Sequence, residues 1–317
     1  MLIEKLVFII FFLILLIFGV KILINSLLKI AHYLKLSDFI IAFLIGGIST
    51  SLPELILGIQ SSIFKVNQIS LGNVLGANIN DLSFILGISI LIPFLFKRLN
   101  FNLEYNLGSL HFVLIFLITI APYLLAIDGY LSFVDGIFLF LLFFGYSYFA
   151  IKENKIKIEK LEQVSFKEFF NSIFYSLFSI ILIVVSSFFV IKESKNLVNL
   201  YGLNNIPFGA LILSISSTMP ELLFSYQSMK KNLVDFAIGN IFGSVAFNSN
   251  IVLAVNAILN PFKIEERINL FINLIFLVFI FLIDWHFLKN KQINILFSIF
   301  LLAYWLLFLV VNFIFLV

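Results

Sequence analysis

The stretch STSLPE at residues 49–54 recurs as SSTMPE at residues 216–221, inside a chain that is otherwise strongly apolar. The two copies are 167 residues apart, and the same offset continues without a gap. Of the 34 positions from Ile48 to Asp81, ten are identical to their partners at this offset. An ionisable residue in a membrane segment costs several kcal/mol unless it has a partner. A duplicated polar motif in such surroundings therefore predicts a functional site.

Each copy is followed by a second conserved-looking pattern of small and polar residues. Eighteen residues after each glutamate stands a glycine-asparagine pair, and a glycine and a carboxylate or carboxamide come next: Gly72, Asn73, Gly76 and Asp81 in the first copy, and Gly239, Asn240, Gly243 and Asn248 in the second. Residues four apart share one face of a helix. The pattern therefore predicts one polar stripe per copy, made of Asn73, Ala77 and Asp81, and of Asn240, Ser244 and Asn248. The glycines would allow close approach of neighbouring helices.

The composition indicates an integral membrane protein. Hydrophobic residues make up 62% of the chain and charged residues 12%, whereas soluble domains contain roughly a quarter charged residues. A formal net charge of +3 does not indicate nucleic acid as a partner. The chain has no cysteine, which excludes disulfides and thiolate metal sites. Three scattered histidines make no zinc motif, and no cofactor is expected.

Apolar runs of about 20 residues, the length that crosses a bilayer, predict ten transmembrane helices. They centre on residues 6–30, 37–64, 69–95, 107–127, 132–151, 167–191, 206–229, 233–260, 268–288 and 293–316. The one long polar connector, KENKIKIEKLEQ at residues 152–163, falls between the fifth and sixth. We therefore expect an all-α membrane protein with two five-helix repeats, 1–151 and 167–317, joined by a connector at 152–166.

An odd number of helices per repeat reverses the orientation of the second copy, so the repeats would face each other inverted in a multi-pass protein of the cell membrane. Loop charges favour the same topology. Thirteen Lys and Arg lie on the side of the connector and six on the other, so the positive-inside rule predicts a cytoplasmic connector and extracellular termini. The alternative is that one short helix is miscounted, which the constant repeat spacing argues against. Lys21 is expected to snorkel, and Asp284 and His286 to lie at a helix end near the interface.

Proline within a helix cannot donate to the carbonyl four residues earlier. Pro53 thus frees the carbonyl of Ser49, and Pro220 that of Ser216. In hydrocarbon, freed carbonyls persist only inside protein or facing a cavity or ion. Hydroxyls surround both breaks, and Glu54 and Glu221 follow them. All these oxygens are hard donors, the type that Ca²⁺ and Na⁺ prefer. The alternative is a set of hydrogen-bonded core polar residues, but two buried glutamates without a nearby Lys or Arg need a cation or proton.

With these residues in view, the chain resembles the sodium/calcium exchanger family of the cation/calcium antiporter superfamily over essentially its full length. Residues 42–91 and 209–258 are similar to that family's alpha repeats, whose usual form is G-T-S-x-P-E followed by G-N-x-x-G-S-N-I-x-N/D. The resemblance implies inverted repeats with broken second and seventh helices, and antiport of Ca²⁺ against several Na⁺ without an obligate protein partner. It also implies these ion ligands: Thr50, Ser51, Glu54, Asp81, Ser217, Thr218, Glu221, Ser244 and Asn248.

The chain departs from the family pattern at several positions. Ser49 and Ser216 replace the motif glycine, and Ala77 stands where a serine is usual. Losing the hydroxyl at 77 removes one Na⁺ ligand, so the sequence leaves H⁺ open as the coupling ion. Asp81 pairs with Asn248, so three carboxylates would face the centre with Glu54 and Glu221. They balance one Ca²⁺ with one charge left over, or about three monovalent ions.

Two other classes of function remain to be separated from antiport. A passive cation channel would conduct downhill without a counter-ion. An intramembrane enzyme would need a nucleophile with its base, or a metal motif, and the chain contains neither GxSxG nor HExxH. The sequence therefore predicts a secondary antiporter and no enzyme, with H⁺/Ca²⁺ exchange as the alternative to Na⁺/Ca²⁺ exchange.

Overall fold

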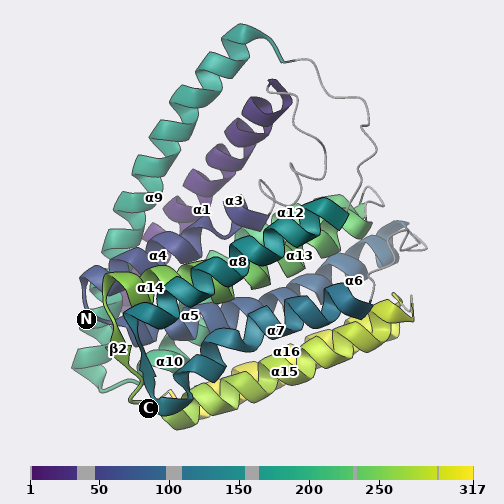
Figure 1. Cartoon of the computed structure of the whole chain (residues 1–317). Helices are drawn as coiled ribbons and strands as arrows, with labels where there is room; N and C mark the ends of the chain where they lie inside the picture. Colours follow the sequence, from purple (N-terminus) through teal and green to yellow (C-terminus); the bar gives the residue numbers. More distant parts are fainter. Residues whose placement is uncertain are drawn as a thin grey trace.

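The computed structural model describes residues 2–33, 47–97, 109–153, 164–230, 234–290 and 293–316, and these are almost entirely helical (Figure 1). The helices of the first half are α1 (Leu2–Tyr33), α3 (Ile48–Thr50), α4 (Leu52–Ile63), α5 (Asn67–Asn80), the π-helical η2 (Asp81–Ile85), α6 (Leu86–Lys97), α7 (Ser109–Leu125), the short η3 (Ala126–Asp128) and α8 (Phe133–Glu153). Those of the second half are α9 (Phe166–Tyr201), α10 (Asn205–Phe208), the π-helical η4 (Gly209–Leu213), α11 (Ser214–Ser217), α12 (Met219–Lys230), α13 (Val234–Phe247), the π-helical η5 (Asn248–Val252), α14 (Leu253–Leu259), α15 (Arg267–Lys289) and α16 (Ile295–Ile314).

The helical segments agree with the predicted spans. Within the described ranges, six helices are long and apolar enough to cross a membrane, and a bent pair, residues 205–217 with 219–230, adds a seventh. α7 and α8 are shorter apolar helices, and α4 continues the second predicted span, whose first part at 37–46 lies outside the described residues. The all-α membrane architecture is therefore confirmed, and the segments are consistent with ten spans. The middle of the predicted connector, residues 154–163, also lies outside the described part.

Contacts between loops show which helix ends lie together. The only regular strands in the described ranges, β1 (Tyr130–Leu131) and β2 (Phe262–Lys263), pair antiparallel and join the turn after α7 to the loop after α14. At the same end, the Asn204 side chain donates to the carbonyl of Phe315 near the C-terminus, over 2.9 Å. The Asn205 backbone donates to Glu266 over 2.6 Å. The loops that the ten-span topology puts on one side therefore meet at one end of the molecule.

The two longest helices, α1 and α9, pack against each other beside the rest of the bundle (Figure 1). Their shared core includes Ile9 and Ile183, both fully buried. The rings of Phe12 and Phe189 stack with centroids 4.6 Å apart. At the loop end, Lys5 pairs with Glu193 over 2.8 Å.

Two helical segments form the centre of the bundle. The segment from Asn67 to Leu95 is 78% buried and the segment from Ala237 to Leu259 is 89% buried, whereas α9, α15 and α16 are 28–39% buried. Both central segments carry the polar stripes predicted from the repeats. Because protein rather than lipid surrounds them, the structure avoids exposing these polar side chains to hydrocarbon.

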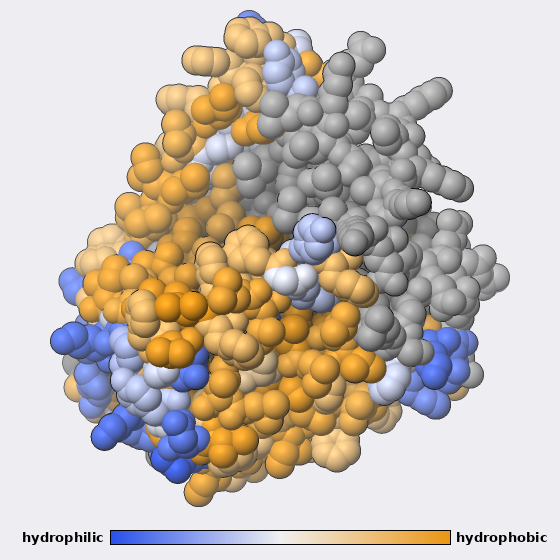
Figure 2. All heavy atoms as spheres, viewed as in Figure 1, coloured by the Kyte–Doolittle hydropathy of each residue, from blue (hydrophilic) through white to orange (hydrophobic). Residues whose placement is uncertain are grey.

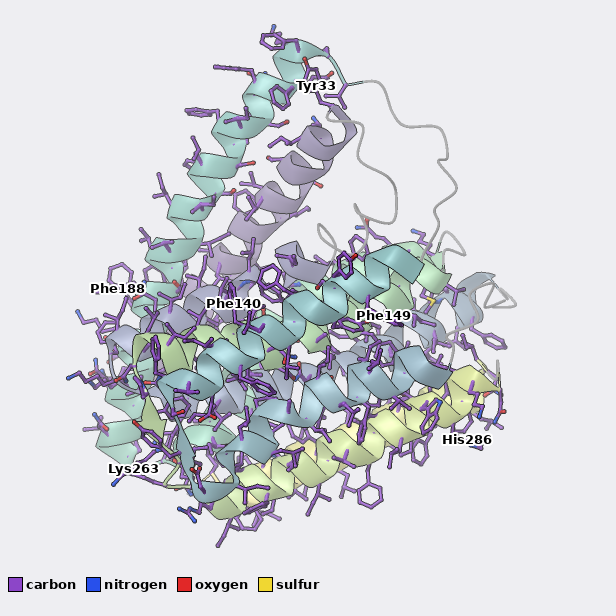
Figure 3. The ribbon with its side chains drawn as sticks, in the orientation of Figure 1. Tyr33, Phe140, Phe149, Phe188, Lys263 and His286 are labelled. Carbon is purple, nitrogen blue, oxygen red and sulfur yellow. The ribbon has the colours of Figure 1, made fainter. Side chains whose placement is uncertain are left out.

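The surface is apolar over most of the visible face, and hydrophilic side chains gather toward two ends (Figure 2). Lys263 in β2 and His286 near the end of α15 mark opposite ends (Figure 3). Large hydrophobic residues in the middle of the outer helices, such as Leu141 on α8, Ile275 on α15 and Leu306 on α16, are exposed. An apolar belt between two polar ends is the surface that a membrane-spanning bundle requires.

Candidate functional site

Both duplicated motifs break a helix at the same repeat position. Between α3 and α4, Ser51 leaves helical geometry with φ −87° and ψ 7°. Between α11 and α12, Thr218 has φ −85° and ψ 6°, and the two parts of this helix bend by 46°. Ser51 and Thr218 are partners at the 167-residue offset. We call α3 with α4 the first broken helix, and α10 to α12 the second broken helix.

Each break is followed by a glutamate in the first turn of the next helix. Glu54 lies in the first turn of α4 and Glu221 in the first turn of α12, and both are 0% exposed. A helix N-terminus carries a partial positive charge that favours a carboxylate there. The prolines cause this arrangement, since Pro53 and Pro220 suit the start of a helix and cannot continue one from before.

Hydroxyls at the breaks contact the opposite repeat. Ser51 Oγ donates to Glu221 Oε1 over 3.2 Å. Thr50 Oγ1 lies 3.2 Å from Ser244 Oγ and 3.4 Å from Asn240 Oδ1. These bonds join the first broken helix to α12 and α13, so the site is built between repeats rather than within one.

The two polar stripes lie across from the breaks. Asp81 begins the π-helical η2 and Asn248 begins the π-helical η5, again at the 167-residue offset. Each packs on the broken helix of the other repeat: η2 against α12, and η5 against α4. Local π-helical turns occur frequently at functional sites because they change the direction of side chains along a helix.

All nine predicted ligands are at most 1% exposed: Thr50, Ser51, Glu54, Asp81, Ser217, Thr218, Glu221, Ser244 and Asn248. Thr218 Oγ1 donates to the carbonyl of Ser214 over 2.8 Å, within its own helix. All nine lie on the two broken helices, on α13 or on the π-helical turns η2 and η5. The structure thus brings the predicted residues to one buried layer; their role as ion ligands stays a prediction.

Several polar atoms of this layer have no hydrogen-bond partner among the described residues. They are both carboxylate oxygens of Glu54 and of Asp81, Oε2 of Glu221, both side-chain polar atoms of Asn248, and Nδ2 of Asn73. Burying a carboxylate without hydrogen bonds or a counter-charge is strongly unfavourable. A bound cation or a proton would remove this cost, and the oxygen-rich donor set fits Ca²⁺ or Na⁺.

The carboxylates also repel one another. Glu54 and Asp81 both lie close enough to Glu221 to interact with its charge, and Glu54 interacts with Asp81. Even so, no group of three or more His, Asp or Glu side chains in the described ranges is arranged to hold a metal by itself. A cation here would therefore need hydroxyl, amide and carbonyl oxygens besides the carboxylates.

Glycines bring the helices of the layer close together. A side chain at Gly72 would collide with the backbone of Ile206, and one at Gly76 would lie 2.6 Å from Ser214 Oγ. At Gly47 a Cβ would come within 3.3 Å of the Gly243 backbone. These close contacts hold α5 against the second broken helix. They also hold α13 against Gly47, the residue directly before the first broken helix.

Three residues of the layer were not among the predicted ligands. Asn73 accepts a hydrogen bond from Ser217 over 3.2 Å, and Asn240 contacts Thr50. Because both asparagines recur at the 167-residue offset, the duplication indicated that they belong to the polar layer. The carbonyl of Gly47 lies 3.4 Å from both Thr50 Oγ1 and Ser244 Oγ. Side-chain patterns carry no signal for a backbone ligand of this kind.

The sequence predicts Asp284 at a helix end near the interface, and the structure buries its side chain inside the bundle. It is 0% exposed within α15, and neither of its oxygens has a hydrogen-bond partner in the described part of the chain. It shares the inward face of α15 with Leu277, Phe281 and Leu288, all at most 4% exposed. Its position near the C-terminal end of the helix suggested an interface, but the helix face on which it lies decides its burial.

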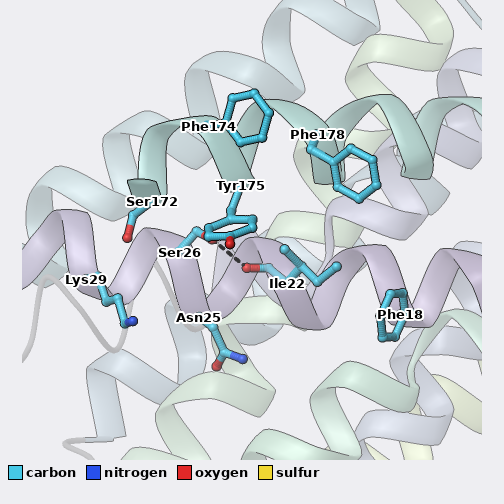
Figure 4. A pocket seen from close by; sticks show the side chains of 9 residues that line it. All are labelled: Phe18, Ile22, Asn25, Ser26, Lys29, Ser172, Phe174, Tyr175 and Phe178. Carbon is cyan, nitrogen blue, oxygen red and sulfur yellow. Dashed lines mark hydrogen bonds between the residues drawn. The ribbon is translucent and has the colours of Figure 1, made fainter. Parts of the chain in front are cut away.

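A cavity of about 530 Å³ lies outside this layer, between α1 and α9 (Figure 4). Phe18 and Phe178 line one end, and Lys29 and Ser172 line the other. On its wall, the Ser26 hydroxyl donates to the carbonyl of Ile22 over 2.8 Å. The cavity contains none of the carboxylates of the polar layer, so it is not the candidate ion site.

Comparisons with known proteins agree with this geometry. The model of the family "Sodium/calcium exchanger protein" matches residues 4–152 and 171–314. The chain is 24% identical over 307 residues to the sodium/calcium exchanger MaX1 of Methanosarcina acetivorans, covering 81% of this chain and 85% of that protein. It is 27% identical over 236 residues to the inner membrane protein YrbG of Escherichia coli, covering 71% of each.

A solved structure of the sodium-calcium exchanger NCX_Mj, soaked with Na⁺ and Sr²⁺, superposes with a TM-score of 0.67 and 25% identity. The match covers 97% of this chain and 98% of that one. The family is one of ion exchangers, not of enzymes. Because the family model matches both halves of the chain, the protein belongs to the sodium/calcium exchanger family of membrane transporters.

Proposed function

We propose that the protein is a secondary active antiporter that exchanges Ca²⁺ for Na⁺ across the cell membrane. The observation that carries the proposal is the pair Glu54 and Glu221, fully buried and without a salt bridge to any described residue. The hydroxyl of Ser51 in the first repeat donates to Glu221 in the second, and the hydroxyls of Thr50 and Ser244 also meet between the repeats. Such carboxylates are stable in a bilayer only with a cation or a proton, and the donor set is that of a hard cation.

Competition for shared ligands would couple the two fluxes. Ca²⁺ would bind mainly to Glu54 and Glu221, and Na⁺ would occupy overlapping and flanking positions that use Asp81 and the hydroxyls. Because three carboxylates cannot all lie bare and adjacent without strong repulsion, the empty site is disfavoured and one cation replaces the other. Exchange of about three Na⁺ for one Ca²⁺, the stoichiometry that the family suggests, would move net charge.

Alternating access would come from the pair α1 and α9 sliding past the site. The two helices pack on each other more extensively than on any other element, and they leave the central segments as a separate, more buried unit. We place the connector 152–166 in the cytoplasm, the termini outside, and the two repeats at 1–151 and 167–317.

H⁺/Ca²⁺ exchange is the second candidate. The observation that favours it is Ala77, fully buried where the other repeat has Ser244, so one hydroxyl of the pseudo-symmetric pair is missing. A proton needs only a carboxylate, whereas Na⁺ needs several neutral oxygens as well.

Uptake of ⁴⁵Ca²⁺ into proteoliposomes separates these functions. An outward Na⁺ gradient at equal pH should drive uptake above the level at equal Na⁺, and a pH gradient at equal Na⁺ should not. Uptake that follows the pH gradient and ignores Na⁺ would support the proton-coupled candidate. Downhill Ca²⁺ flux that needs neither counter-ion would indicate a channel and contradict antiport.

A further inference from the structure

A chain of hydrogen bonds connects the peripheral helix α16 to the second broken helix. Trp305 Nε1 on α16 donates to Asn80 Oδ1 over 2.9 Å. Asn80 Nδ2, at the end of α5, donates to Ser214 Oγ over 3.0 Å. The hydroxyl of Ser214 then donates to the carbonyl of Ala210 within its own helix.

The direction of this chain is fixed by its chemistry. The indole N–H of Trp305 can only donate, so the amide oxygen of Asn80 must face it and the amide nitrogen must face Ser214. The Ser214 hydroxyl donates its one proton to the carbonyl of Ala210, so its oxygen can accept a hydrogen bond from Asn80 Nδ2. Each member is satisfied, and a fully satisfied buried polar network is rigid.

The chain ends next to the candidate ion ligands. The carbonyl of Ser214 accepts from Thr218 Oγ1 over 2.8 Å, and Ser217 Oγ, whose proton goes to Asn73 Oδ1 over 3.2 Å, lies 3.3 Å from the same carbonyl. A hydroxyl that donates its proton to a carbonyl keeps its lone pairs free for a cation. The position of Ser214 therefore sets the direction in which Thr218 presents its oxygen, and Ser217 lies in the same turn, with its hydroxyl beside the carbonyl of Ser214.

Packing reinforces the hydrogen bonds. The Trp305 ring stacks on Phe84 with centroids 4.4 Å apart and an angle of 25° between the planes. Gly76, one helical turn before Asn80, lets α5 approach so closely that an added Cβ would lie 2.6 Å from Ser214 Oγ. Little movement of α11 against α5 is possible while these contacts persist.

The equivalent place in the other repeat lacks every member of the chain. At the 167-residue offset, Phe247 stands for Asn80, Gly47 for Ser214, and Phe138 for Trp305; Phe138 is 47% exposed. A cavity of about 360 Å³, lined by Phe247, Ile48 and Phe143 among others, lies there instead. The break of the first broken helix is therefore not tied to a peripheral helix in this way.

We propose that Asn80 and Trp305 are positioning residues that hold the last turn of α11, so that Ser217 and Thr218 are pre-arranged to bind the transported cation. The proposal rests on the proposed function of the polar layer. It makes the two repeats unequal, because the second broken helix is tied to a peripheral helix by a chain of hydrogen bonds that the first broken helix lacks.

The two tryptophans of the chain supply a matched test. Trp305→Phe keeps the ring on Phe84 and removes the donor, whereas Trp285→Phe makes the same change where the indole N–H has no partner in the described part. Loss of groups that orient metal ligands typically weakens metal affinity 10–100-fold. We expect the Ca²⁺ concentration for half-maximal exchange to rise about 10-fold in Trp305→Phe and in Asn80→Leu, with a nearly unchanged maximal rate, and to stay constant in Trp285→Phe.

The double variant Trp305→Phe/Asn80→Leu should be no worse than Asn80→Leu alone, because both changes break one chain. Fluorescence gives a readout independent of transport. In Trp285→Phe the only indole is Trp305, and its emission should stay the same when Ca²⁺ or Na⁺ is added to saturation, because the chain of hydrogen bonds is already formed before an ion binds. Adding Asn80→Leu removes the acceptor of the indole N–H and should shift this emission, although Ca²⁺ still raises the thermal stability of the purified protein.

Normal Ca²⁺ affinity in both Trp305→Phe and Asn80→Leu would overturn the positioning role, and so would a Trp305 emission that Asn80→Leu leaves unchanged. These failures leave the proposed function intact, because the wild type exchanges in the same assay. Absence of Na⁺-driven Ca²⁺ flux in the wild type would overturn the proposed function and this proposal with it. If Asn80→Leu does not fold, Trp305→Phe still decides, since it preserves the packing.

Discussion

The hydroxyl of Ser217 donates a hydrogen bond to Asn73 Oδ1, 3.2 Å away. The same contact occurs at positions shifted by 167 residues, where Thr50 Oγ1 lies 3.4 Å from Asn240 Oδ1. Each bond joins the broken helix of one repeat to the central helix of the other. A pair of reciprocal contacts of this kind is what two inverted repeats around a shared site produce.

This reciprocity predicts matched losses in Thr50→Ala and Ser217→Ala. Each variant loses one neutral oxygen and the bond to the asparagine of the other repeat, worth about 1 kcal/mol, so Ca²⁺ exchange should fall roughly fivefold in both. Initial rates of ⁴⁵Ca²⁺ uptake in proteoliposomes measure this. Ser187→Ala is the control, since its hydroxyl only bonds back to Val184 in α9. A severe loss in one variant and none in the other would contradict a shared site.

The sequence predicted the architecture well because its signals were strong. Spans of about 20 apolar residues and a duplication at constant spacing placed the helices and the two breaks. It also predicted which residues become buried together, since Glu54 and Glu221 have no acceptable position in lipid. Ser51 and Thr218 have nearly the same φ and ψ angles at the two helix breaks, and this agreement follows from the same duplication.

The repeats also predict how Asp81 and Asn248 work together. Both begin π-helical turns that pack on the broken helix of the other repeat. Asp81→Asn should weaken Ca²⁺ exchange, and Asn248→Asp should add a fourth carboxylate that repels its neighbours or takes up a proton. The double variant Asp81→Asn/Asn248→Asp restores the number of carboxylates. It should therefore recover part of the Ca²⁺ exchange that is lost in the more impaired of the two single variants. Strictly additive losses in transport assays of folded protein would show that the two positions do not share a site.

Ala77→Ser tests the choice of coupling ion. Its partner Ser244 contacts Thr50 over 3.2 Å, and Ala77 is fully buried at the equivalent position on α5. An added hydroxyl should lower the Na⁺ concentration for half-maximal Ca²⁺ efflux by about fivefold, equivalent to roughly 1 kcal/mol. Efflux measured at several Na⁺ concentrations and constant pH gives the answer. An unchanged Na⁺ dependence together with a strong pH dependence would favour proton coupling.

Gly72→Ala should destabilise the bundle without touching a ligand. Its Cβ would lie 2.8 Å from the Cα of Ile206, at the start of the second broken helix. Overpacking of this kind costs about 1–3 kcal/mol, which should lower the unfolding temperature in detergent. Gly145→Ala is the control, because an added Cβ there meets no described atom within 4 Å. Equal unfolding temperatures of the two variants would mean that α5 and α10 are not in close contact.

What the sequence missed lies where the repeats differ. Asn80, Ser214 and Trp305 have no polar partner at the 167-residue offset, so the duplication carried no signal for them. The burial of Asp284 was also missed. Its position near the end of α15 suggested exposure, but it lies on the face of that helix that packs into the bundle. Long-range contacts between side chains far apart in the chain depend on helix packing, which local patterns do not encode.

The central claim is that Glu54 and Glu221 jointly hold the transported cation. The most direct measurement is Na⁺-driven ⁴⁵Ca²⁺ uptake by wild type, Glu54→Gln and Glu221→Gln, reconstituted at equal amounts. Removing one charged ligand from a buried site costs about 3 kcal/mol, so uptake should fall by about 100-fold or more, and to a similar extent in the two variants. Near-normal Na⁺-driven uptake by either correctly folded variant would contradict the claim.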